Sequence, residues 1–398
     1  MKVLVVNAGS SSLKYQLLDM ENEKVIAKGN CEKIAIPGSF IKYKANGMEK
    51  VFEGDLKNHT EALAKVFEIL TNKEYGVLAS LAEIEAVGHR IVHGGEVFTD
   101  SVIITEEVMG QLEDLIPLGP LHMPANISGV KACQEIMPGV PQIAVFDTAF
   151  HSHMPKEAFL YGIPYEAYTD WKIRKYGFHG TSHRFVSMEC AKLLGKQDAK
   201  IITCHLGNGS SISAVKNGIS IDTTMGLTPL AGVLMGTRSG DIDPSILEAI
   251  QDRTGWSLKE ITNYLNKKSG LLGVGGISSD MRDNENAMKA GNERAALAYK
   301  MLAYQIKKFI GSYVAAMNGV DAILFTGGIG ENDALLRGMV CEGLDCLGIK
   351  MDFEKNANFK RGVVSDLTAE GSKAKVYIIP TDEELMIARD TKNLVENN

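Results

Sequence analysis

The sequence has few of the features that mark membrane, secreted or nucleic-acid-binding proteins. Its 398 residues contain no apolar run of membrane-spanning length, and the four-residue apolar run in MKVLVVNAGSSS is too short for a signal peptide. No run of lysine and arginine occurs, and 49 acidic side chains outnumber 42 basic ones, giving a net charge of −7. We therefore expect a cytoplasmic protein that binds neither membranes nor nucleic acid.

Cysteine is also scarce. None of the six cysteines belongs to a C-x-x-C pair, so we expect reduced thiols, with a redox link between Cys341 and Cys346 as the alternative. With 45% hydrophobic and 23% charged residues, the composition is that of a soluble globular protein. The length favours two or three domains.

Apolar strand patterns alternate with helical ones along the chain, which is typical of an α/β protein. KVLVV, YQLLDM and VIAKGNCEKI predict an antiparallel meander, and IEAVGHRIVHGG and PQIAVFDTAF predict buried strands. AKVYIIP predicts a late strand before a final helix, DEELMIARDTKNLV. One face of the longest expected helix carries Leu302, Ile306, Phe309, Ile310, Tyr313, Val314 and Met317.

One strand-turn-strand pattern occurs twice, about half a chain apart. VVNAGSSSLKYQLL near the N-terminus and CHLGNGSSISAV in the middle both join apolar runs through a polar Gly/Ser turn. The repeat predicts two copies of one α/β domain, with a cleft that both loops face. The alternative is a coincidence of two Gly/Ser hairpins.

Four glycine-rich segments favour a polyphosphate ligand. Backbone N–H groups in tight turns form anion-binding nests, and serine hydroxyls add donors. Besides the two hairpins, TGGIGEN (326–332) follows the strand AILF, and GVGGISSDMRDNE (273–285) lies upstream. No Walker A motif is present.

Two arginines are candidates for anion binding. Arg90 lies in an apolar strand, where an unpaired charge is costly, although a surface position is the alternative. Arg238 lies in the polar loop MGTRSGD and is better placed to meet an anion. Asp243 and Pro244, just after it, are expected at N-cap and N1 of the helix SILEAI.

Two acidic sites follow buried strands, where ligands of α/β proteins collect. Asp147 is a catalytic or metal candidate, with a turn or N-cap role as the alternative. Glu383 and Glu384 are equally explained as first-turn acids behind a cap at Thr381 or Asp382. Further upstream, Thr105 is expected to cap the helix EEVMGQLEDLI.

Eight of the nine histidines lie between residues 89 and 205, which raises the possibility of zinc. The pairs His151/His153 and His179/His183 have ligand-like spacing. Against zinc, a helix N-cap at Thr181 or Ser182 would keep the second pair off one helical face. His179, in a Gly-flanked turn, suits an anion-facing donor better.

Taken in order, nine motifs resemble the acetate kinase (acetokinase) family across essentially the whole chain: NAGSSSLKYQL, GHRIVHGGE, FDTAFH, YGFHGTSH, HLGNGSS, MGTRSGD, GGISSDMRD, FTGGIGEN and TDEEL. The resemblance implies two duplicated ribonuclease-H-like domains of the actin/Hsp70/sugar kinase type around a central nucleotide cleft. It implies a first domain at 1–150 plus 385–398, a nucleotide-binding second domain at 151–384, and a homodimer.

By matching motifs, the resemblance also implies site residues. The implied catalytic residues are Arg90, Asp147, His179 and Arg238. The implied acetate-binding residues are Arg90 with the methyl-pocket walls Val92, Leu121, Phe178 and Pro229. The implied nucleotide ligands are Ser10, Ser12, Lys14, His205, Leu206, Gly207, Asn208, Gly209, Asp280, Met281, Arg282, Gly328, Ile329, Gly330, Glu331 and Asn332. Mg²⁺, with Mn²⁺ as an alternative, is implied at Asn7 and Glu383.

The implied reaction is reversible transfer of the ATP γ-phosphoryl group to acetate. One departure is visible, because a segment that usually reads APLHNPPN is GPLHMPAN here, with Gly119, Met123 and Ala125. A propionate kinase is the nearest alternative. A chaperone-type or filament ATPase would need a peptide-binding module or polymer interface, and a serine hydrolase would need the absent G-x-S-x-G elbow.

Overall fold

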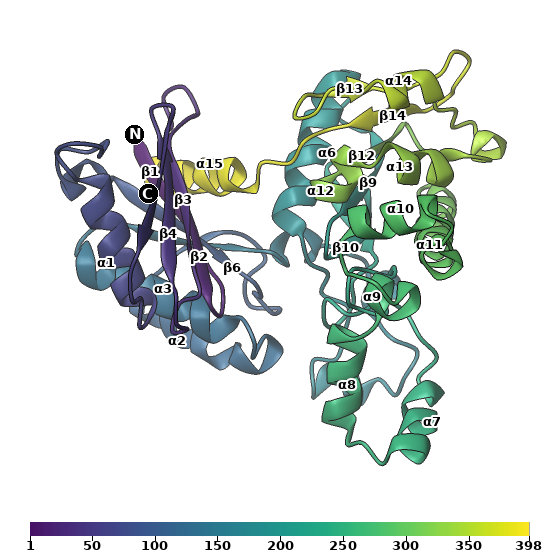
Figure 1. Cartoon of the computed structure of the whole chain (residues 1–398), viewed down its shortest axis with the longest axis horizontal. Coiled ribbons are helices and arrows are strands. Elements are labelled where there is room, and N and C mark those ends of the chain that lie inside the picture. The colour runs from purple at the N-terminus through teal and green to yellow at the C-terminus, as the bar shows by residue number, and fades with distance from the viewer. Residues whose placement is uncertain (398) are drawn as a thin grey trace. The chain divides into compact units, whose positions relative to one another are not determined.

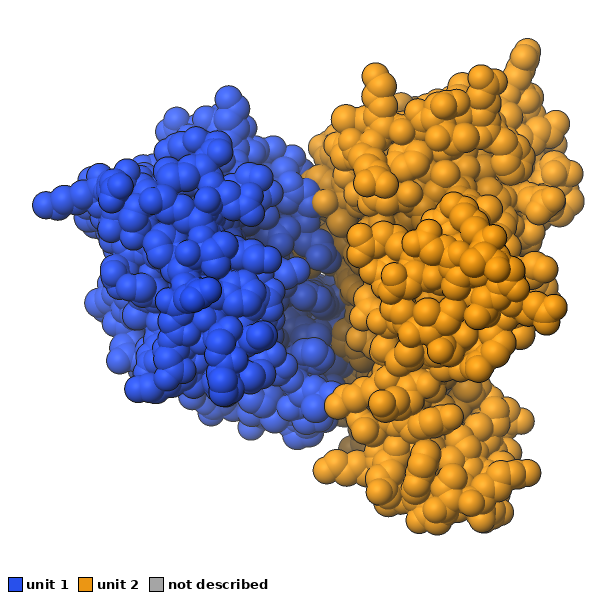
Figure 2. Space-filling model, viewed as in Figure 1, with its two compact units in different colours: residues 1–152, 382–398 blue, residues 153–381 orange. Residues whose placement is uncertain are grey.

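The computed structural model describes residues 1–397 as two compact units (Figures 1 and 2). Unit 1 comprises Met1–Ser152 and the C-terminal segment from Asp382 on, and unit 2 comprises His153–Thr381. The domain ranges predicted from the sequence differ from these bounds by a few residues.

Unit 1 is built on an eight-stranded sheet in the order β5-β4-β3-β2-β1-β6-β8-β7. Its strands are β1 (Lys2–Ala8), β2 (Ser12–Asp19), β3 (Lys24–Glu32), β4 (Phe40–Ala45), β5 (Met48–Glu53), β6 (Ala86–Ile91), β7 (Val102–Ile103) and β8 (Gln142–Phe146). Strands β1 to β5 pair antiparallel in sequence order, whereas β1–β6 and β6–β8 pair parallel and β7 runs antiparallel to β8. The predicted meander is confirmed and continues into β4 and β5.

Alternate residues of β1 face two different cores, as the two-residue period of a strand requires. Leu4 and Val6 pack with α1 (His59–Leu70) and α3 (Met123–Ile136), and Val3 and Val5 pack with α15 (Glu383–Glu396) on the other face. The C-terminal helix thus completes the unit that begins the chain. The short helix α2 (Glu106–Asp114) contacts α3, and Thr105 caps it as predicted, accepting a hydrogen bond from Val108 N.

Unit 2 repeats this strand order in a six-stranded sheet, β11-β10-β9-β12-β14-β13. The strands are β9 (Lys200–Leu206), β10 (Ser210–Lys216), β11 (Ile219–Thr223), β12 (Ala322–Thr326), β13 (Ser365–Asp366) and β14 (Lys375–Ile378). As in unit 1, three antiparallel strands are followed by two parallel ones and a short antiparallel edge strand. The predicted duplication is confirmed, because β11-β10-β9-β12-β14-β13 corresponds strand by strand to β3-β2-β1-β6-β8-β7.

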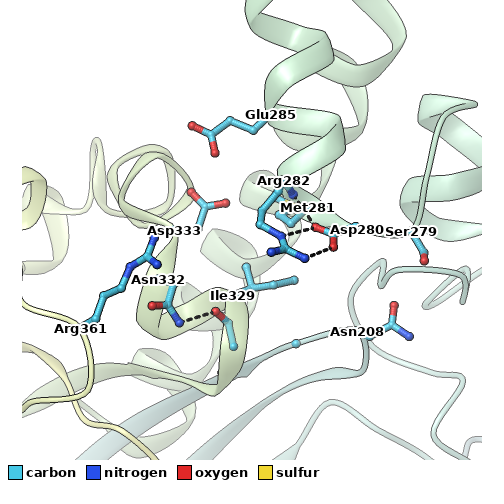
Figure 3. Close-up of a pocket in the computed structure, with 12 residues that line it drawn as sticks. Asn208, Ser279, Asp280, Met281, Arg282, Glu285, Ile329, Asn332, Asp333 and Arg361 are labelled. Atoms are coloured by element: carbon cyan, nitrogen blue, oxygen red, sulfur yellow. Dashed lines mark hydrogen bonds and ion pairs between the residues drawn. The ribbon is translucent and has the colours of Figure 1, made fainter.

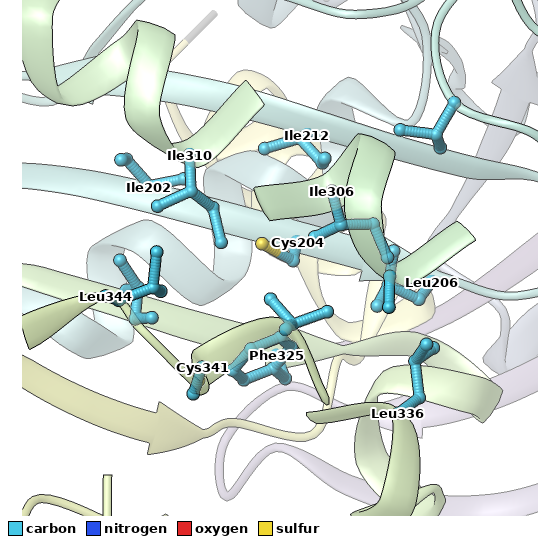
Figure 4. Packing of buried hydrophobic residues seen from close by; sticks show 14 of the residues in the cluster. Ile202, Cys204, Leu206, Ile212, Ile306, Ile310, Phe325, Leu336, Cys341 and Leu344 are labelled. Atoms are coloured by element: carbon cyan, nitrogen blue, oxygen red, sulfur yellow. The ribbon is translucent and has the colours of Figure 1, made fainter. Parts of the chain in front are cut away.

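The long helix α11 (Glu293–Met317) packs its predicted face onto this sheet. Ile306 and Ile310 meet Cys204 and Phe325 in the main core (Figure 4), while Phe309 and Val314 of the same predicted face are only partly buried. The other helices of unit 2 are α4 (Lys156–Phe159), α5 (Glu166–Thr169), α6 (Gly180–Leu194), α7 (Ser245–Thr254), α8 (Leu258–Lys267), α9 (Gly270–Gly275), α10 (Met281–Lys289), α12 (Gly327–Asn332), α13 (Ala334–Cys341) and α14 (Phe353–Ala357).

Two predicted helix starts are wrong. Helix α6 begins at Gly180, with His179 at the N-cap in a left-handed conformation (φ 56°), so Thr181 and Ser182 lie inside its first turn. Helix α7 begins at Ser245, one residue later than expected. Asp243 still satisfies an end group of that helix, since its Oδ1 accepts a hydrogen bond from Ser245 N at 2.9 Å.

All six cysteines are free thiols, so Cys341 and Cys346 are not linked. Cys341 is buried and Cys346 is exposed. Within residues 1–397, no helix combines the length and the apolar character needed to cross a bilayer.

Replacing His89 with glutamine should make the stability of the fold less sensitive to acid. His89 on β6 is 2% exposed, and its Nε2 contacts Gln142 Oε1 at 2.7 Å. Burial lowers the pKa of His89 from 6.5 to about 4, against the raising effect of that hydrogen bond. Below pH 6.5 the unfolded chain binds a proton that the folded chain does not, so His89 costs up to about 3 kcal/mol of stability as the pH falls to 4.

The midpoint of thermal unfolding, measured from pH 7 to pH 4.5, tests this expectation. The midpoint of His89→Gln should fall less steeply with acid than that of the unmodified protein. Equal slopes would show that His89 is not a source of acid sensitivity.

Candidate active site

The carboxyl ends of three parallel strands bring three predicted site residues to one edge of unit 1. Asn7 is the penultimate residue of β1, Arg90 is the penultimate residue of β6, and Asp147 directly follows β8. The register sets them side by side, because β1 and β6 pair in parallel up to Val6 and His89. This is the sheet edge at which ligands of α/β proteins collect.

Arg90 and Asp147 form a two-pronged ion pair. Arg90 Nε donates to Oδ1 at 2.9 Å and Nη2 donates to Oδ2 at 2.6 Å. Asp147 is 1% exposed, and its charge raises the pKa of Arg90 above the ordinary value despite burial. This ion pair explains how the apolar strand β6 tolerates a cation. It also fixes the plane of the guanidinium, and the Nη1 group takes no part in the ion pair.

Glu383 adds a second carboxylate to unit 1, on a residue that is partly buried. It opens helix α15 behind Asp382, which caps the helix as predicted by accepting a hydrogen bond from Leu385 N. Glu383 Oε1 is buried and accepts no hydrogen bond. Burial raises the pKa of Glu383 to about 7, Arg90 lowers it, and Asp147 adds to the rise. A buried carboxylate oxygen without a donor fits a hard cation such as Mg²⁺, which takes one or two protein carboxylates and completes its shell with phosphate oxygens and water.

The first Gly/Ser turn joins β1 to β2. Gly9 N donates to Ser12 O at 2.8 Å, and Gly9 O lies 2.6 Å from His59 Nε2 of helix α1. The contact with His59 thus anchors the turn to helix α1, while Ser10 and Lys14 are exposed. Lys14 sits opposite Asn7 in the β1–β2 register, so the turn is polar and open where the sequence predicts phosphate.

A cavity of about 560 Å³ opens in unit 2 (Figure 3). Its lining residues are Gly207, Asn208, Ser279, Asp280, Met281, Arg282, Glu285, Gly328, Ile329, Asn332, Asp333 and Arg361. Most of them come from the three motifs HLGNG, DMR and GIGEN, which are far apart in the sequence. The volume is that of a small-molecule pocket.

Two arginines and the start of helix α10 give this cavity its polar character. Arg282 pairs with Asp280 at 2.6 Å, and Asp280 also caps α10 by accepting a hydrogen bond from Arg282 N. Figure 3 shows Arg361 at the opposite side of the pocket from Asp280. Gly328 leaves the floor open, because a Cβ there would meet no atom within 4 Å. The pocket therefore has guanidinium groups, backbone groups and open space at Gly328 with which to bind a polar ligand.

Five residues of the predicted nucleotide motifs do not line this cavity: His205, Leu206, Gly209, Gly330 and Glu331. Leu206 is fully buried in the core. Glu331 Oε1 accepts hydrogen bonds from Gly327 N at 3.0 Å and Thr381 N at 3.2 Å, so this side chain holds the loop.

Arg238, His179 and Gly209 meet beside the second Gly/Ser turn. A Cβ placed on Gly209 would lie 3.3 Å from Arg238 Nη1 and 3.5 Å from His179 Nε2. Arg238 Nη1 donates to Pro229 O at 3.2 Å, and within residues 1–397 no carboxylate pairs with this guanidinium. Burial lowers the pKa of Arg238. Besides the Pro229 carbonyl, Nη1 contacts only the thioether of Met235, whose Sδ lies 3.8 Å away. A half-buried cation with no other partners is suited to binding an anion.

The two histidines of the YGFHGTSH motif share a hydroxyl. Ser211 Oγ lies 2.9 Å from His179 Nδ1 and 2.7 Å from His183 Nε2. The expectation that a cap at Thr181 or Ser182 separates them is therefore wrong. Within the described chain, however, no three His, Cys, Asp or Glu side chains gather as a metal site.

The four predicted methyl-pocket residues divide between the units. Val92 and Leu121 belong to unit 1, where Val92 is partly buried and Leu121 is 73% exposed. Phe178 and Pro229 belong to unit 2, where Phe178 is buried.

Sequence reasoning missed several residues around both sites. Asp333 and Arg361 line the cavity, and Ser211 links the two histidines. Ser279 and Glu285 also line it; they belong to the predicted segment 273–285 but were not singled out as ligands. Asp333 had a local signal, because it follows GIGEN and caps α13. Arg361 lies outside every motif, so only the three-dimensional structure could reveal it.

The acetokinase family matches residues 2–389. The chain belongs to this family. It is 58% identical to the acetate kinase of Caldanaerobacter subterraneus subsp. tengcongensis over 400 residues, covering 100% of this chain and 99% of that protein. The crystal structure of Porphyromonas gingivalis acetate kinase superposes with a TM-score of 0.95 at 48% identity, and a propionate kinase from Francisella tularensis with 0.93 at 44%, each covering 99% of both chains. With the shared strand order of the two sheets, these superpositions confirm the predicted duplicated α/β fold.

Proposed function

We propose that this member of the acetokinase family catalyses reversible transfer of the ATP γ-phosphoryl group to acetate, giving acetyl phosphate and ADP. The observation that carries the proposal is the position of Arg238, a half-buried cation without a carboxylate partner. Arg238 and His179 both lie against Gly209, in the Gly/Ser turn that also borders the cavity of unit 2. Acetate kinases that are 58% and 55% identical over the full length are among its relatives.

The reaction requires alignment and charge neutralisation more than acid–base help. An acetate oxygen forms a bond to the γ-phosphorus, and the bond from that phosphorus to the β,γ-bridging oxygen breaks. Carboxyl pKa values near 4 leave acetate ionised at neutral pH, so no base has to remove a proton. Arg90 offsets the repulsion between acetate and ATP, while Arg238 and His179 hold the oxygens of the transferred group.

We assign nucleotide binding to the cavity of unit 2 and acetate binding to unit 1. Arg282 and Arg361 suit the negative charge of a nucleotide, and Ile329 and Met281 offer apolar contact to its base. Asn7, Asp147 and Glu383 are the residues that would hold Mg²⁺, or Mn²⁺ in its place. When bound, the ion neutralises charge on the phosphate oxygens.

Acetate is the proposed acceptor, and propionate is the nearest alternative because a related structure is a propionate kinase. Comparing kcat/KM for acetate, propionate and butyrate distinguishes the two. We expect acetate to lead, with propionate a poorer but real substrate, since one methylene in an apolar pocket is worth about 1–3 kcal/mol. A higher value for propionate would favour the alternative.

Val92→Ala should shift the preference toward propionate by up to about tenfold. Val92 lies two residues after Arg90, and a Cβ on Gly119 would be 3.2 Å from its Cγ1, so glycine leaves room behind this side chain. The measurement is the ratio of kcat/KM for propionate and acetate. Val108→Ala, which truncates another partly buried valine of the same cluster, is the control. An unchanged ratio in Val92→Ala would remove Val92 from the methyl pocket.

We also propose a cytoplasmic homodimer. The six free thiols suit a reducing compartment. Unit 2 exposes large apolar side chains at Trp171 and Leu258, which are 66% and 61% exposed, and no residue of α7 is buried. Light scattering after gel filtration should give twice the monomer mass of 43.2 kDa.

A further inference from the structure

A chain of buried hydroxyls and imidazoles runs from the interior of unit 2 to His179. Thr203 Oγ1 lies 2.6 Å from His183 Nδ1, Ser211 Oγ lies 2.7 Å from His183 Nε2, and the same oxygen lies 2.9 Å from His179 Nδ1. Thr203, His183 and Ser211 are each 0% exposed. Because an unsatisfied buried polar group is costly, the protons along this chain must be ordered.

The Ser211 hydroxyl has one proton, and the histidine to which it donates this proton determines which ring nitrogens of His179 and His183 are protonated. A hydroxyl between two ring nitrogens donates to one and accepts from the other. If Ser211 donates to His179 Nδ1, it accepts from His183 Nε2–H, and His183 Nδ1 in turn accepts from Thr203. If it donates to His183, then His179 must carry its proton on Nδ1.

The position of Thr203 selects the first direction. Its Oγ1 is 2.6 Å from His183 Nδ1 but 3.5 Å from Ser213 O, the other acceptor within reach. If Thr203 instead accepted from His183, its own proton would have only Ser213 O as an acceptor, at 3.5 Å, which is too long for a good hydrogen bond. Because a buried proton without a close acceptor is costly, Thr203 donates to His183. The proton of His183 then lies on Nε2 and points to Ser211, which leaves the Ser211 proton for His179 Nδ1.

Two groups pack around the His179 ring. The ring of His205 stacks on it with centroids 4.2 Å apart, and the Arg238 guanidinium lies against the same Gly209 turn. Neutral imidazole has one N–H, so the tautomer decides whether Nε2 presents a donor or a lone pair.

We propose that Ser211 and His183 are positioning residues that hold His179 as the Nε2–H tautomer, so that a neutral imidazole donates to the transferred phosphoryl group. The inference rests on the proposed function for the identity of that group. The opposite tautomer would turn a lone pair toward phosphate oxygens and repel them. Ser211 therefore acts on catalysis through His179 without touching the substrate.

Nitrogen-15 NMR of histidine-labelled protein reads the tautomer directly. We expect the unmodified protein to show His179 protonated at Nε2. Ser211→Ala should give a mixture of tautomers and lower kcat by about 10- to 100-fold, less than the 10²- to 10³-fold cost of deleting a transition-state donor outright. The KM for ATP should stay within about threefold, because the cavity of unit 2 is untouched. Ser211→Thr, which keeps the hydroxyl, should restore most of kcat.

Ser213→Ala is the matched control, because Ser213 lies on the same strand two residues on, is 0% exposed, and bonds Thr223 Oγ1 instead of a histidine. A His179 signal protonated at Nδ1 in the unmodified protein would overturn the proposal. So would a Ser211→Ala variant with an unchanged tautomer and the same kcat as Ser213→Ala. If the unmodified protein makes no acetyl phosphate, the proposed function fails, and the tautomer measurement still tests whether Ser211 and His183 position His179.

Discussion

Replacing Arg238 with alanine should lower kcat by about 10³-fold or more, the scale of an arginine that neutralises charge in phosphoryl transfer. No carboxylate among residues 1–397 pairs with Arg238, and its Nη1 and the His179 ring both lie against Gly209. An arginine that acts mainly on the transition state changes kcat and not ground-state binding, so the affinity for ATP should change little.

Steady-state kinetics with a separate ATP-binding titration measure both quantities. Arg253→Ala is the control, because Arg253 is an exposed arginine that donates only to Ala249 O of its own helix. A loss of kcat of tenfold or less in Arg238→Ala would remove Arg238 from the proposed role. A parallel loss of ATP affinity would assign Arg238 to nucleotide binding.

Asp147→Asn should cut kcat severely and raise the Mg²⁺ concentration needed for half activity by about 10- to 100-fold. An acid among phosphates is electrostatically unfavourable unless a cation offsets it. Arg90 does so in the structure, and the donorless Oε1 of Glu383 nearby leaves a place for a second cation. Asparagine keeps the shape of residue 147 but removes the charge. The KM for acetate should also rise, because Arg90 loses its two-pronged partner.

Activity measured against Mg²⁺ at several pH values tests this assignment. The residual rate should keep both limbs of the original pH profile, since acetate has no proton to give up. If Asp147 were a general base, Asp147→Asn would lose the acid limb at a constant Mg²⁺ requirement. Asp321→Asn is the control, because Asp321 pairs with Lys196 at the amino end of β12, away from the carboxyl edge of the sheet.

The duplicated fold could be predicted because its signals are local. Each Gly/Ser turn lies between two strands that pair directly with each other, so the repeat is visible within about 25 residues of sequence. The strand order on the parallel side of each sheet needs long-range pairing. The pattern of residues did not predict this order, and the family resemblance implied only the type of duplicated fold.

The partners of the site residues could not be predicted, because they depend on contacts distant in sequence. Arg90 and Asp147 are 57 residues apart, and Ser211 meets His179 across 32 residues. The misplaced start of α6 has a physical reason. Capping statistics favour Thr or Ser at an N-cap, but here His179 occupies that position in a left-handed conformation, and Ser182 turns to His205 Nδ1 at 2.7 Å.

The most direct test of the proposed reaction is phosphorus-31 NMR of the purified protein with Mg²⁺ and ATP, in the presence and absence of acetate. We expect acetyl phosphate and ADP to form in equal amounts only when acetate is present, and ATP to form when the protein is given acetyl phosphate and ADP. Release of ADP and inorganic phosphate at a rate independent of acetate, with no acetyl phosphate, would contradict the proposal and indicate an ATPase.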